Sequence, residues 1–231
     1  MNEKPGLPRG QGKIIPPSHR NFFTSNYDLY DKLYISISHT SHTMKAPISR
    51  ELVYLSLWEN PETRIARLVE VTGLPYAYVH RLIRRIEERG AIVNISGHVK
   101  LIDKRTLLHI WAEDKRRILS IVRPFRIELL PYSVRDAVLF SGTAGMWVLG
   151  KTATPAGGIL YIKESDLEDI IKARNPEGYP FLLYFYSDLF FKWTVERRGF
   201  KLPSTGLLLA DILAQGEYSR HFEELCDMLV G

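Results

Sequence analysis

Cysteine is almost absent from the 231-residue chain, which contains only Cys226. A single thiol excludes an intramolecular disulfide framework and is typical of a reducing compartment. No apolar run approaches the roughly 18 residues that mark a membrane-spanning helix, and the first residues lack the apolar segment of a signal peptide. We therefore expect a cytoplasmic protein. Glutamine is also rare, with only Gln11 and Gln215, which suggests a thermophilic source.

Local motifs of common enzymes are missing as well. The sequence has no metal-spaced set of His and Cys residues, no G-x-S-x-G nucleophile motif and no Walker phosphate loop. Asp166, Glu168 and Asp169 fit the first turn of a helix, where acidic side chains favour the helix dipole. Asp188 and Asp211 are isolated in sequence, although catalytic groups can converge from distant segments. We expect no enzymatic activity, no cofactor and no metal.

Charge is unevenly distributed along the chain. The net charge is +5, but residues 1–126 carry 21 Lys and Arg against 12 Asp and Glu, whereas residues 127–231 carry 10 against 14. A basic front half joined to an acidic rear half is typical of a nucleic-acid-binding domain fused to a second module. Hydrophobic residues make up 45% of the chain, which is enough for a sizeable core.

Residues 63–102 contain the most informative pattern. Two helical patterns follow one another, with apolar stripes formed by Ile65, Leu68 and Val69, then by Val79, Leu82, Ile83 and Ile86. Between them, Gly73 tolerates a left-handed backbone and Pro75 suits a first helical turn. Gly90 ends the second helix, and two short strands follow around Ser96-Gly97. This order predicts a winged helix-turn-helix, whose second helix enters the DNA major groove.

The outward face of the second helix is basic and aromatic. Arginine can fork onto a guanine edge or hold a phosphate, and tyrosine can contact a phosphate or a thymine methyl. The alternative is an ordinary helical bundle with a solvated arginine face, but the hairpin directly after the helix favours a DNA reader. The predicted DNA-binding residues are Tyr76, Ala77, Tyr78, His80, Arg81, Arg84 and Arg85 in the helix and Ser96, Gly97, His98 and Lys100 in the wing.

The chain is expected to divide into four segments, and the fold class is α+β. Residues 1–46 form a flexible basic arm and a short packed segment. Residues 47–103 form the winged helix-turn-helix domain, and residues 104–126 a connecting helix and linker. Residues 127–231 form a mixed α/β C-terminal domain.

Several local expectations accompany these segments. A first helix at 50–59 would be capped by Ser49, and Asp103 would cap the connecting helix. The basic end of that helix, Lys115 to Arg117, would stay exposed, either simply solvated or near the DNA backbone. In the rear half we expect strands at 125–130, 157–162, 181–186 and 190–195, and helices at 133–149, 165–173, 203–215 and 218–230.

The stretch from Leu52 to Val230 resembles the AbiEi-type antitoxin and transcriptional-regulator family. The resemblance rests on the winged-helix pattern, on LLHIWAEDKRR (107–117), VLFSGTAGMWVLG (138–150) and GILYI (158–162), and on a closing segment with Asp211, Gly216 and 222–229. It implies a front half that represses a promoter and a rear domain that antagonises a nucleotidyltransferase-type toxin or contributes to assembly on DNA. Tyr76, Ala77, Tyr78, Arg81, Arg84 and Arg85 match the family's recognition helix, and Gly97, His98 and Lys100 its wing.

The sequence thus favours a sequence-specific double-stranded DNA-binding regulator, an antitoxin-like autorepressor that binds as a possible homodimer. A protein-interaction module, with the acidic rear domain as its binding surface, is the second hypothesis. A nucleic-acid-modifying enzyme that the winged helix directs to its substrate is the third. We expect no association with a membrane.

Overall fold

The computed structural model describes residues 50–119, 124–127, 135, 138–155, 157–185, 188–216 and 220–230. The arm and packed segment predicted for residues 1–46 and the predicted N-cap Ser49 lie outside these ranges. Helices and two β-sheets give the described chain a mixed α/β fold. The described residues belong to one compact unit.

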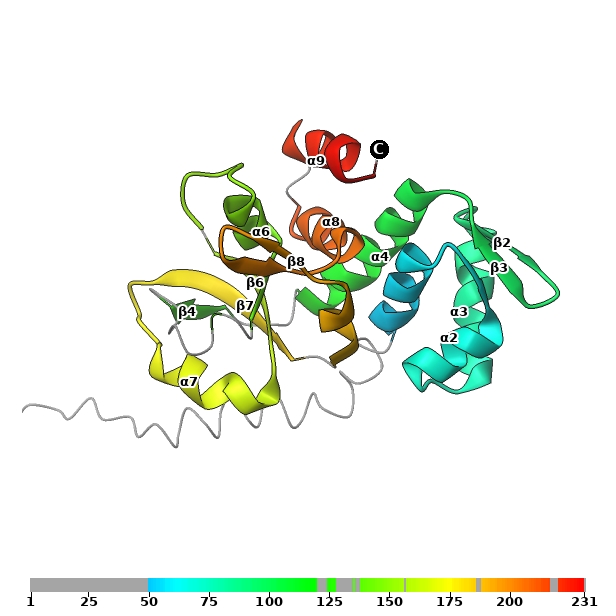
Figure 1. Ribbon diagram of the computed structural model, residues 1–231, viewed down its shortest axis with the longest axis horizontal. Coiled ribbons are helices and arrows are strands. Elements are labelled where there is room, and N and C mark those ends of the chain that lie inside the picture. The colour runs from blue at the N-terminus through cyan, green and yellow to red at the C-terminus, as the bar shows by residue number, and fades with distance from the viewer. Residues whose placement is uncertain are drawn as a thin grey trace, which may run out of the picture. The chain divides into compact units, whose positions relative to one another are not determined.

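The front of the described chain combines three helices with a three-stranded sheet (Figure 1). The strands pair antiparallel in the order β1-β3-β2. The elements in chain order are a helix at 50–59, β1 (Glu62–Arg64), α2 (Ile65–Thr72), α3 (Tyr76–Glu88), β2 (Ile92–Ile95) and β3 (His98–Leu101).

A tight turn connects α2 to α3. Gly73 adopts a left-handed conformation with φ 65°, and its N–H bonds to the carbonyl of Val69 at 2.9 Å, which closes the end of α2. Pro75 precedes the first residue of α3, where its missing N–H costs no helical hydrogen bond. The buried face of α3 consists of the four predicted residues, Val79, Leu82, Ile83 and Ile86.

The β2–β3 hairpin turns through Ser96 and Gly97, which both have positive φ angles, 51° and 84°. Such a two-residue turn matches the twist of the flanking strands, as the Ser-Gly pair predicted. Strand β1 was not predicted. It pairs with β3 so that Glu62 lies opposite Lys100 and Arg64 opposite His98.

The rear of the described chain is built on a six-stranded mixed sheet in the order β4-β7-β6-β5-β9-β8. The β6–β7 and β5–β9 pairs are parallel, and the other pairs are antiparallel. The strands are β4 (Phe125–Ile127), β5 (Leu139–Ser141), β6 (Gly158–Ile162), β7 (Tyr179–Phe185), β8 (Val195–Arg197) and β9 (Phe200–Leu202). The helices are α4 (Lys104–Leu119), α6 (Thr143–Val148), η1 (Glu164–Asp166), α7 (Leu167–Lys172), η2 (Asp188–Trp193), α8 (Thr205–Ala214) and α9 (Arg220–Val230).

Two of the predicted elements in this half are wrong. Of the helix expected at 133–149, the part at 139–148 is instead strand β5 followed by α6, because Gly142 at φ 59° interrupts a helix and the three residues of β5 are buried on both faces. Residues 133, 134, 136 and 137 lie outside the described ranges. A strand buried on both faces reads as a continuous apolar run, which helical periodicity does not distinguish from a helix. The strand expected at 190–195 is the 3₁₀ helix η2 followed by β8.

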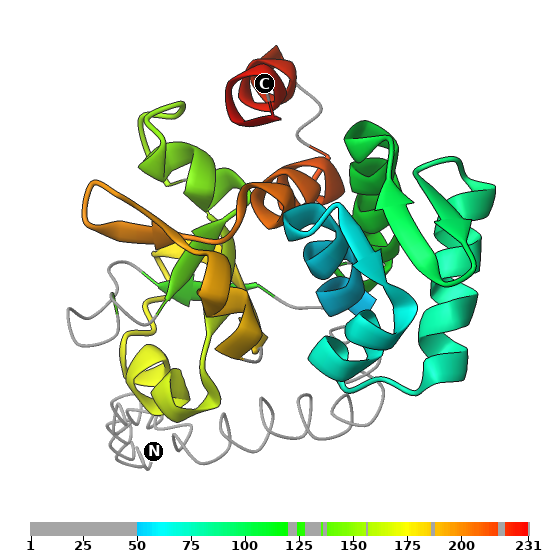
Figure 2. The ribbon, with the colours of Figure 1, turned by 45° about the vertical axis from the view of Figure 1, so that its right-hand side comes forward.

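One hydrophobic core extends through both halves of the described chain, from Leu52 to Cys226. Helices α4 and α8 pack side by side within it (Figure 2). The helix at 50–59 also packs on α8, because Trp58 donates a hydrogen bond to Thr205 at 3.2 Å and its ring lies against Gly206. Helix α4, expected to be a connector, therefore lies inside the core and holds the two halves together.

Candidate nucleic-acid interface

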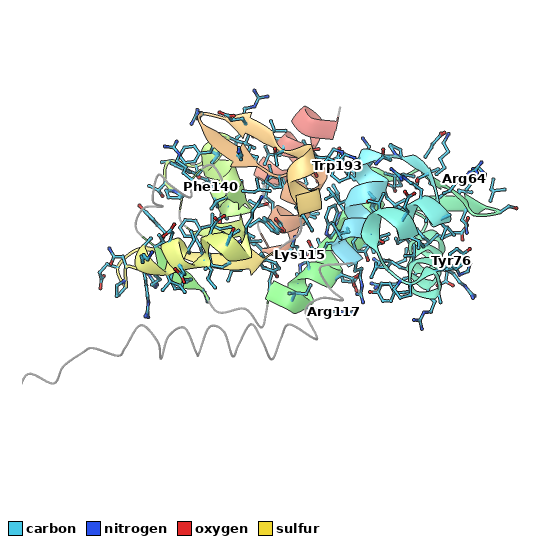
Figure 3. The ribbon with its side chains drawn as sticks, turned by 60° about the horizontal axis from the view of Figure 1, so that its bottom comes forward. Arg64, Tyr76, Lys115, Arg117, Phe140 and Trp193 are labelled. Carbon is cyan, nitrogen blue, oxygen red and sulfur yellow. The ribbon has the colours of Figure 1, made fainter. Side chains whose placement is uncertain are left out.

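Five of the seven predicted α3 residues lie on an exposed face of the helix. Tyr76, Ala77, His80, Arg81 and Arg84 are all exposed, and 55% of Tyr76 is accessible although it is aromatic. The Tyr76 and His80 rings stack with their centroids 6.0 Å apart. Figure 3 shows Tyr76 at the periphery of the molecule, well away from the buried Lys115. This face, called here the α3 face, offers ring surfaces and cations to solvent.

The two arginines of the α3 face are available to an anion. Within the ranges that the structure describes, Arg81 has neither a hydrogen-bond nor an ion-pair partner among protein groups. Arg84 pairs with Glu88 at 3.0 Å, one helical turn further on, and 73% of its side chain is accessible. Exposed pairs of this kind contribute about 0.3–0.5 kcal/mol, so a phosphate or guanine can replace Glu88 at little cost.

Tyr78 and Arg85, which were also predicted to contact DNA, turn toward the protein. Arg85 donates two hydrogen bonds to the carboxylate of Asp114, at 3.1 and 2.8 Å. The hydroxyl of Tyr78 accepts a hydrogen bond from Nε of Arg50 at 3.1 Å, and its ring packs against the core. The groups that engage them come from α4 and the helix at 50–59, which a helical wheel of α3 does not include.

Most of the predicted wing residues in the β2–β3 hairpin are exposed to solvent. Ser96 and His98 are exposed at the tip, and the Gly97 carbonyl accepts a hydrogen bond from the Ile65 N–H at 3.0 Å, which ties the tip to the start of α2. Lys100 is exposed and pairs with Glu62 at 2.6 Å. Their mutual hydrogen bond and charge attraction lower the pKa of Glu62 and raise the pKa of Lys100.

The outer face of the three-stranded sheet carries a feature that sequence reasoning missed. A concavity there is lined by Arg64, His98 and Lys100 and by the apolar side chains of Val93, Ile95 and Ile102. Ile95 is 69% exposed, the highest value among the large exposed hydrophobic side chains of the described residues. Strand β1 brings Arg64 to this face, opposite His98. Because β1 was not predicted, the closeness of Arg64 and His98 was not predicted either.

Asp114 in α4 is the centre of a group that joins three helices. It accepts hydrogen bonds from Arg85 of α3 and, at 3.1 Å and 2.5 Å, from Arg50 and Tyr54 of the helix at 50–59. Burial raises the pKa of this carboxyl, but the hydrogen bonds from Arg85 and Tyr54 and the charges of both arginines outweigh it, so the pKa lies below its ordinary value. We call Arg50, Tyr54, Arg85 and Asp114 the Asp114 group.

The next residue, Lys115, points into the core. The sequence predicted that it would be exposed; this is wrong, since its side chain is fully buried. Its ammonium lies 2.8 Å from Oε2 of Glu51 and also contacts Asp211 of α8 and the hydroxyl of Tyr161 of β6. Asp211 accepts further hydrogen bonds from Ser141 and Tyr161. We call these five residues the Lys115 cluster.

The Lys115 cluster holds three charges away from water. Burial lowers the pKa of Lys115, but the carboxylates of Asp211 and Glu51 outweigh it and raise the pKa above its ordinary value. Burial raises the pKa of both Asp211 and Glu51, against the attraction of Lys115. Through these contacts the cluster links the helix at 50–59, α4, α8 and β6, as expected of buried charges, which occur mostly in paired form.

A signal for these buried groups was present in the sequence. Asp114 and Lys115 follow Leu107, Leu108 and Trp111 at helical spacing, so both fall on or beside the buried stripe of α4. Asp211 is the lone charge in an apolar ten-residue helix. A charged residue on an apolar stripe requires a buried partner of opposite sign.

Arg116 and Arg117, the other two basic residues at this end of α4, are exposed, as expected. Arg116 donates a hydrogen bond to the carbonyl of Leu213 at 2.9 Å, and Arg117 lies 3.6 Å from Glu113, one turn before it. Figure 3 shows Arg117 close to the end of α4. Both cations are therefore engaged by the protein itself.

Comparison with known proteins adds no family to this description. A scan against models of known families finds no match for the chain, and a search of curated proteins finds no relative. Within the described ranges, every helix is too short or too polar to cross a lipid bilayer. The family resemblance drawn from the sequence stays a prediction.

Proposed function

We propose that this protein is a sequence-specific regulator that binds double-stranded DNA through a winged helix-turn-helix. In this proposal α2 and α3 are the helix-turn-helix pair, α3 is the recognition helix, and the β2–β3 hairpin is the wing. The order of helix, strand, two helices and hairpin, with the sheet order β1-β3-β2, supports the assignment.

The observation that carries the proposal is the α3 face. A helix that follows a tight turn presents Arg81, which has no partner among the residues that the structure describes, beside an exposed Arg84 and two stacked aromatic rings. Arginine forks onto the O6 and N7 atoms of guanine or holds a phosphate, and aromatic rings pack on sugars and thymine methyl groups. An exposed tyrosine ring beside two exposed arginines is the combination that these contacts require.

The contact set that we propose differs from the one predicted by the sequence. Tyr78 and Arg85 are left out, because the Asp114 group engages both side chains. Arg64 is added to the wing, because it lies opposite His98 in the sheet. The proposed contacts are Tyr76, Ala77, His80, Arg81 and Arg84 on α3 and Arg64, Ser96, Gly97, His98 and Lys100 on the wing.

The direct test is binding of the full chain to DNA fragments from its own upstream region, measured by fluorescence anisotropy. Arg81→Ala combined with Arg84→Ala is expected to weaken binding by at least tenfold, since each lost bidentate contact costs about 1–3 kcal/mol. The melting temperature should stay nearly unchanged, because neither arginine is buried. Lys172→Ala is the matched control, since Lys172 is an exposed cation of α7 that pairs with Asp169. Equal affinity of the double variant and the wild type would rule the proposal out.

The family resemblance extends the proposal to the biological role. We infer an antitoxin-like autorepressor that binds its promoter as a homodimer and antagonises a nucleotidyltransferase-type toxin through its rear half. A reading frame for such a toxin beside this gene, and growth arrest by that toxin which this protein relieves, would support the role. Growth arrest that this protein does not relieve would remove the antitoxin part and leave DNA binding intact.

A second candidate function is protein docking, and one observation favours it. Val93, Ile95 and Ile102 are exposed together on the outer face of the three-stranded sheet. Grouped apolar side chains mark protein contacts more often than DNA contacts. Mutation separates the two functions: Ile95→Ser combined with Ile102→Ser would disrupt a protein partner's binding to this face, whereas Arg81→Ala combined with Arg84→Ala would leave it intact.

A further inference from the structure

Two consecutive residues of α4 bind different elements, although both also contact the helix at 50–59. The Asp114 carboxylate binds α3 through Arg85 and the helix at 50–59 through Arg50 and Tyr54. The Lys115 ammonium binds Asp211 of α8 and Tyr161 of β6, besides Glu51. The turn of α4 that holds these residues is thus fixed in the core, and α3 is attached to it.

We propose that Asp114 is a positioning residue for DNA reading, which sets the orientation of α3 through Arg85. This inference rests on the proposed function of α3. Asp114 itself is 95% inaccessible to solvent and touches no DNA in this account. It acts through the helix that carries Arg81 and Arg84.

The geometry of the Arg85–Asp114 pair suits this role. Both terminal nitrogens of the guanidinium bond to the carboxylate, one to each oxygen at 3.1 and 2.8 Å, so the pair fixes a plane as well as a distance. Arg85 follows Arg84 directly and lies one turn after Arg81. Any rotation of α3 about its axis therefore moves Arg81, Arg84 and the anchored Arg85 together.

The Arg85–Asp114 pair differs in burial from a second ion pair that lies close to it. Arg89, the C-cap residue that follows α3, and Glu113 of α4 form this second ion pair at 2.5 Å, but about two-fifths of each side chain is accessible. Water and salt ions compete for the charges of an exposed ion pair, so such a pair fixes the relative position of two helices only weakly. Glu113 is thus a matched control for Asp114, because it is the preceding residue of α4 and pairs with an arginine at the end of α3, but is far more exposed.

The experiment compares the wild type with Asp114→Asn, Arg85→Ala, their combination and Glu113→Gln, all in the full chain. Two quantities are measured: affinity for the cognate DNA across a range of salt concentrations, and hydrogen–deuterium exchange of α3 amides without DNA. Asp114→Asn and Arg85→Ala are each expected to weaken binding about tenfold, the equivalent of one lost charge-assisted hydrogen bond. The double variant should bind DNA no more weakly than either single variant, because each single substitution already removes the Arg85–Asp114 pair.

The salt dependence of DNA affinity distinguishes a positioning residue from a residue that contacts phosphate. Log affinity should fall with log salt at the wild-type slope in both variants, because no phosphate contact is removed. Exchange of the α3 amides should become faster in both. Glu113→Gln should change affinity by twofold or less and leave α3 exchange unaltered.

Two results would overturn the inference. One is unchanged affinity and unchanged α3 exchange in Asp114→Asn and Arg85→Ala. The other is a salt slope that falls by about one in Arg85→Ala, which would make Arg85 itself a phosphate contact. If the wild type binds no DNA, the proposed function fails instead, and faster α3 exchange in Asp114→Asn would then show an anchored helix that serves another surface.

Discussion

Oε2 of Glu51 lies 2.8 Å from the ammonium of Lys115, and both side chains are buried. Their chain neighbours, Arg50 and Asp114, form a second ion pair at 3.1 Å. The helix at 50–59 and α4 thus carry adjacent charges in opposite order, plus-minus on one and minus-plus on the other. Sliding either helix by one residue would bring like charges together, so these pairs fix the register of two helices that otherwise meet through apolar side chains.

Removing the cation from the Lys115 cluster should be costly. Lys115→Met leaves Glu51 and Asp211 buried without their counter-charge, and we expect a loss of about 3–5 kcal/mol in the free energy of unfolding. Urea denaturation followed by circular dichroism measures it. Arg117→Ala, on the exposed side of α4, should change stability by at most about 0.5 kcal/mol. A Lys115→Met protein as stable as the wild type would mean that the cluster does not specify the packing.

Asp114 should make stability depend on pH on the acid side. Its pKa in the folded protein lies below the ordinary 3.8, so its contribution is present above that value and is lost as pH falls through the folded pKa. The Asp114→Asn variant lacks this titrating carboxyl. The stability difference between wild type and Asp114→Asn should therefore shrink as pH is lowered below about 4.

The carboxyls of Glu51 and Asp211 have pKa values that shift the other way, but both proteins contain them, so their contribution largely cancels in this difference. Urea titrations at a series of pH values measure it. A difference that stays constant from neutral pH to about pH 2 would show that Asp114 has an ordinary pKa.

The ion pair on the wing should restrain DNA binding. Glu62 places a negative charge 2.6 Å from Lys100, on the surface that we propose faces phosphates. Glu62→Gln removes the charge and frees Lys100, and we expect DNA affinity to rise severalfold at low salt. Stability should stay nearly unchanged, because the pair is exposed. Asp169→Asn, which frees Lys172 on α7, is the control. Unchanged binding in Glu62→Gln would place the DNA elsewhere.

The packing of α8 on the helix at 50–59 should tolerate no added atoms. A Cβ on Gly206 would lie 2.5 Å from ring carbons of Trp58, closer than packed carbon atoms approach. Gly206→Ala should therefore destabilise the protein by about 1–3 kcal/mol, although alanine favours helices. Thermal unfolding followed by Trp fluorescence measures it. A stabilised Gly206→Ala protein would show that this contact is loose.

Local patterns in the sequence predicted the elements of the front half well. Gly73, Pro75 and the stripe of α3 each specify a backbone or a buried face within a few residues, so the two helices and the hairpin were placed correctly. Strand β1 was missed because three residues between two helices carry no periodicity. Its partner β3 is more than thirty residues away in the chain, and only the fold brings them together.

The contact partners of individual side chains were harder to predict from the sequence than the helices and strands. Arg81 and Arg85 look alike on a helical wheel, yet one is free among the described residues and the other is held by Asp114, 29 residues away. Lys115 was placed on the surface because three basic residues in a row usually end a solvated helix. Its two carboxylate partners lie 64 and 96 residues from it, and no local pattern identifies such partners.

The salt dependence of DNA binding tests the central claim most directly. Log affinity of the wild type for its upstream DNA should fall linearly with log salt, and Arg81→Ala with Arg84→Ala should weaken binding at every salt concentration. If one of these arginines contacts phosphate, the slope should also decrease by about 0.9. An affinity that does not respond to salt, or a double variant that matches the wild type throughout, would contradict a DNA-reading role for α3.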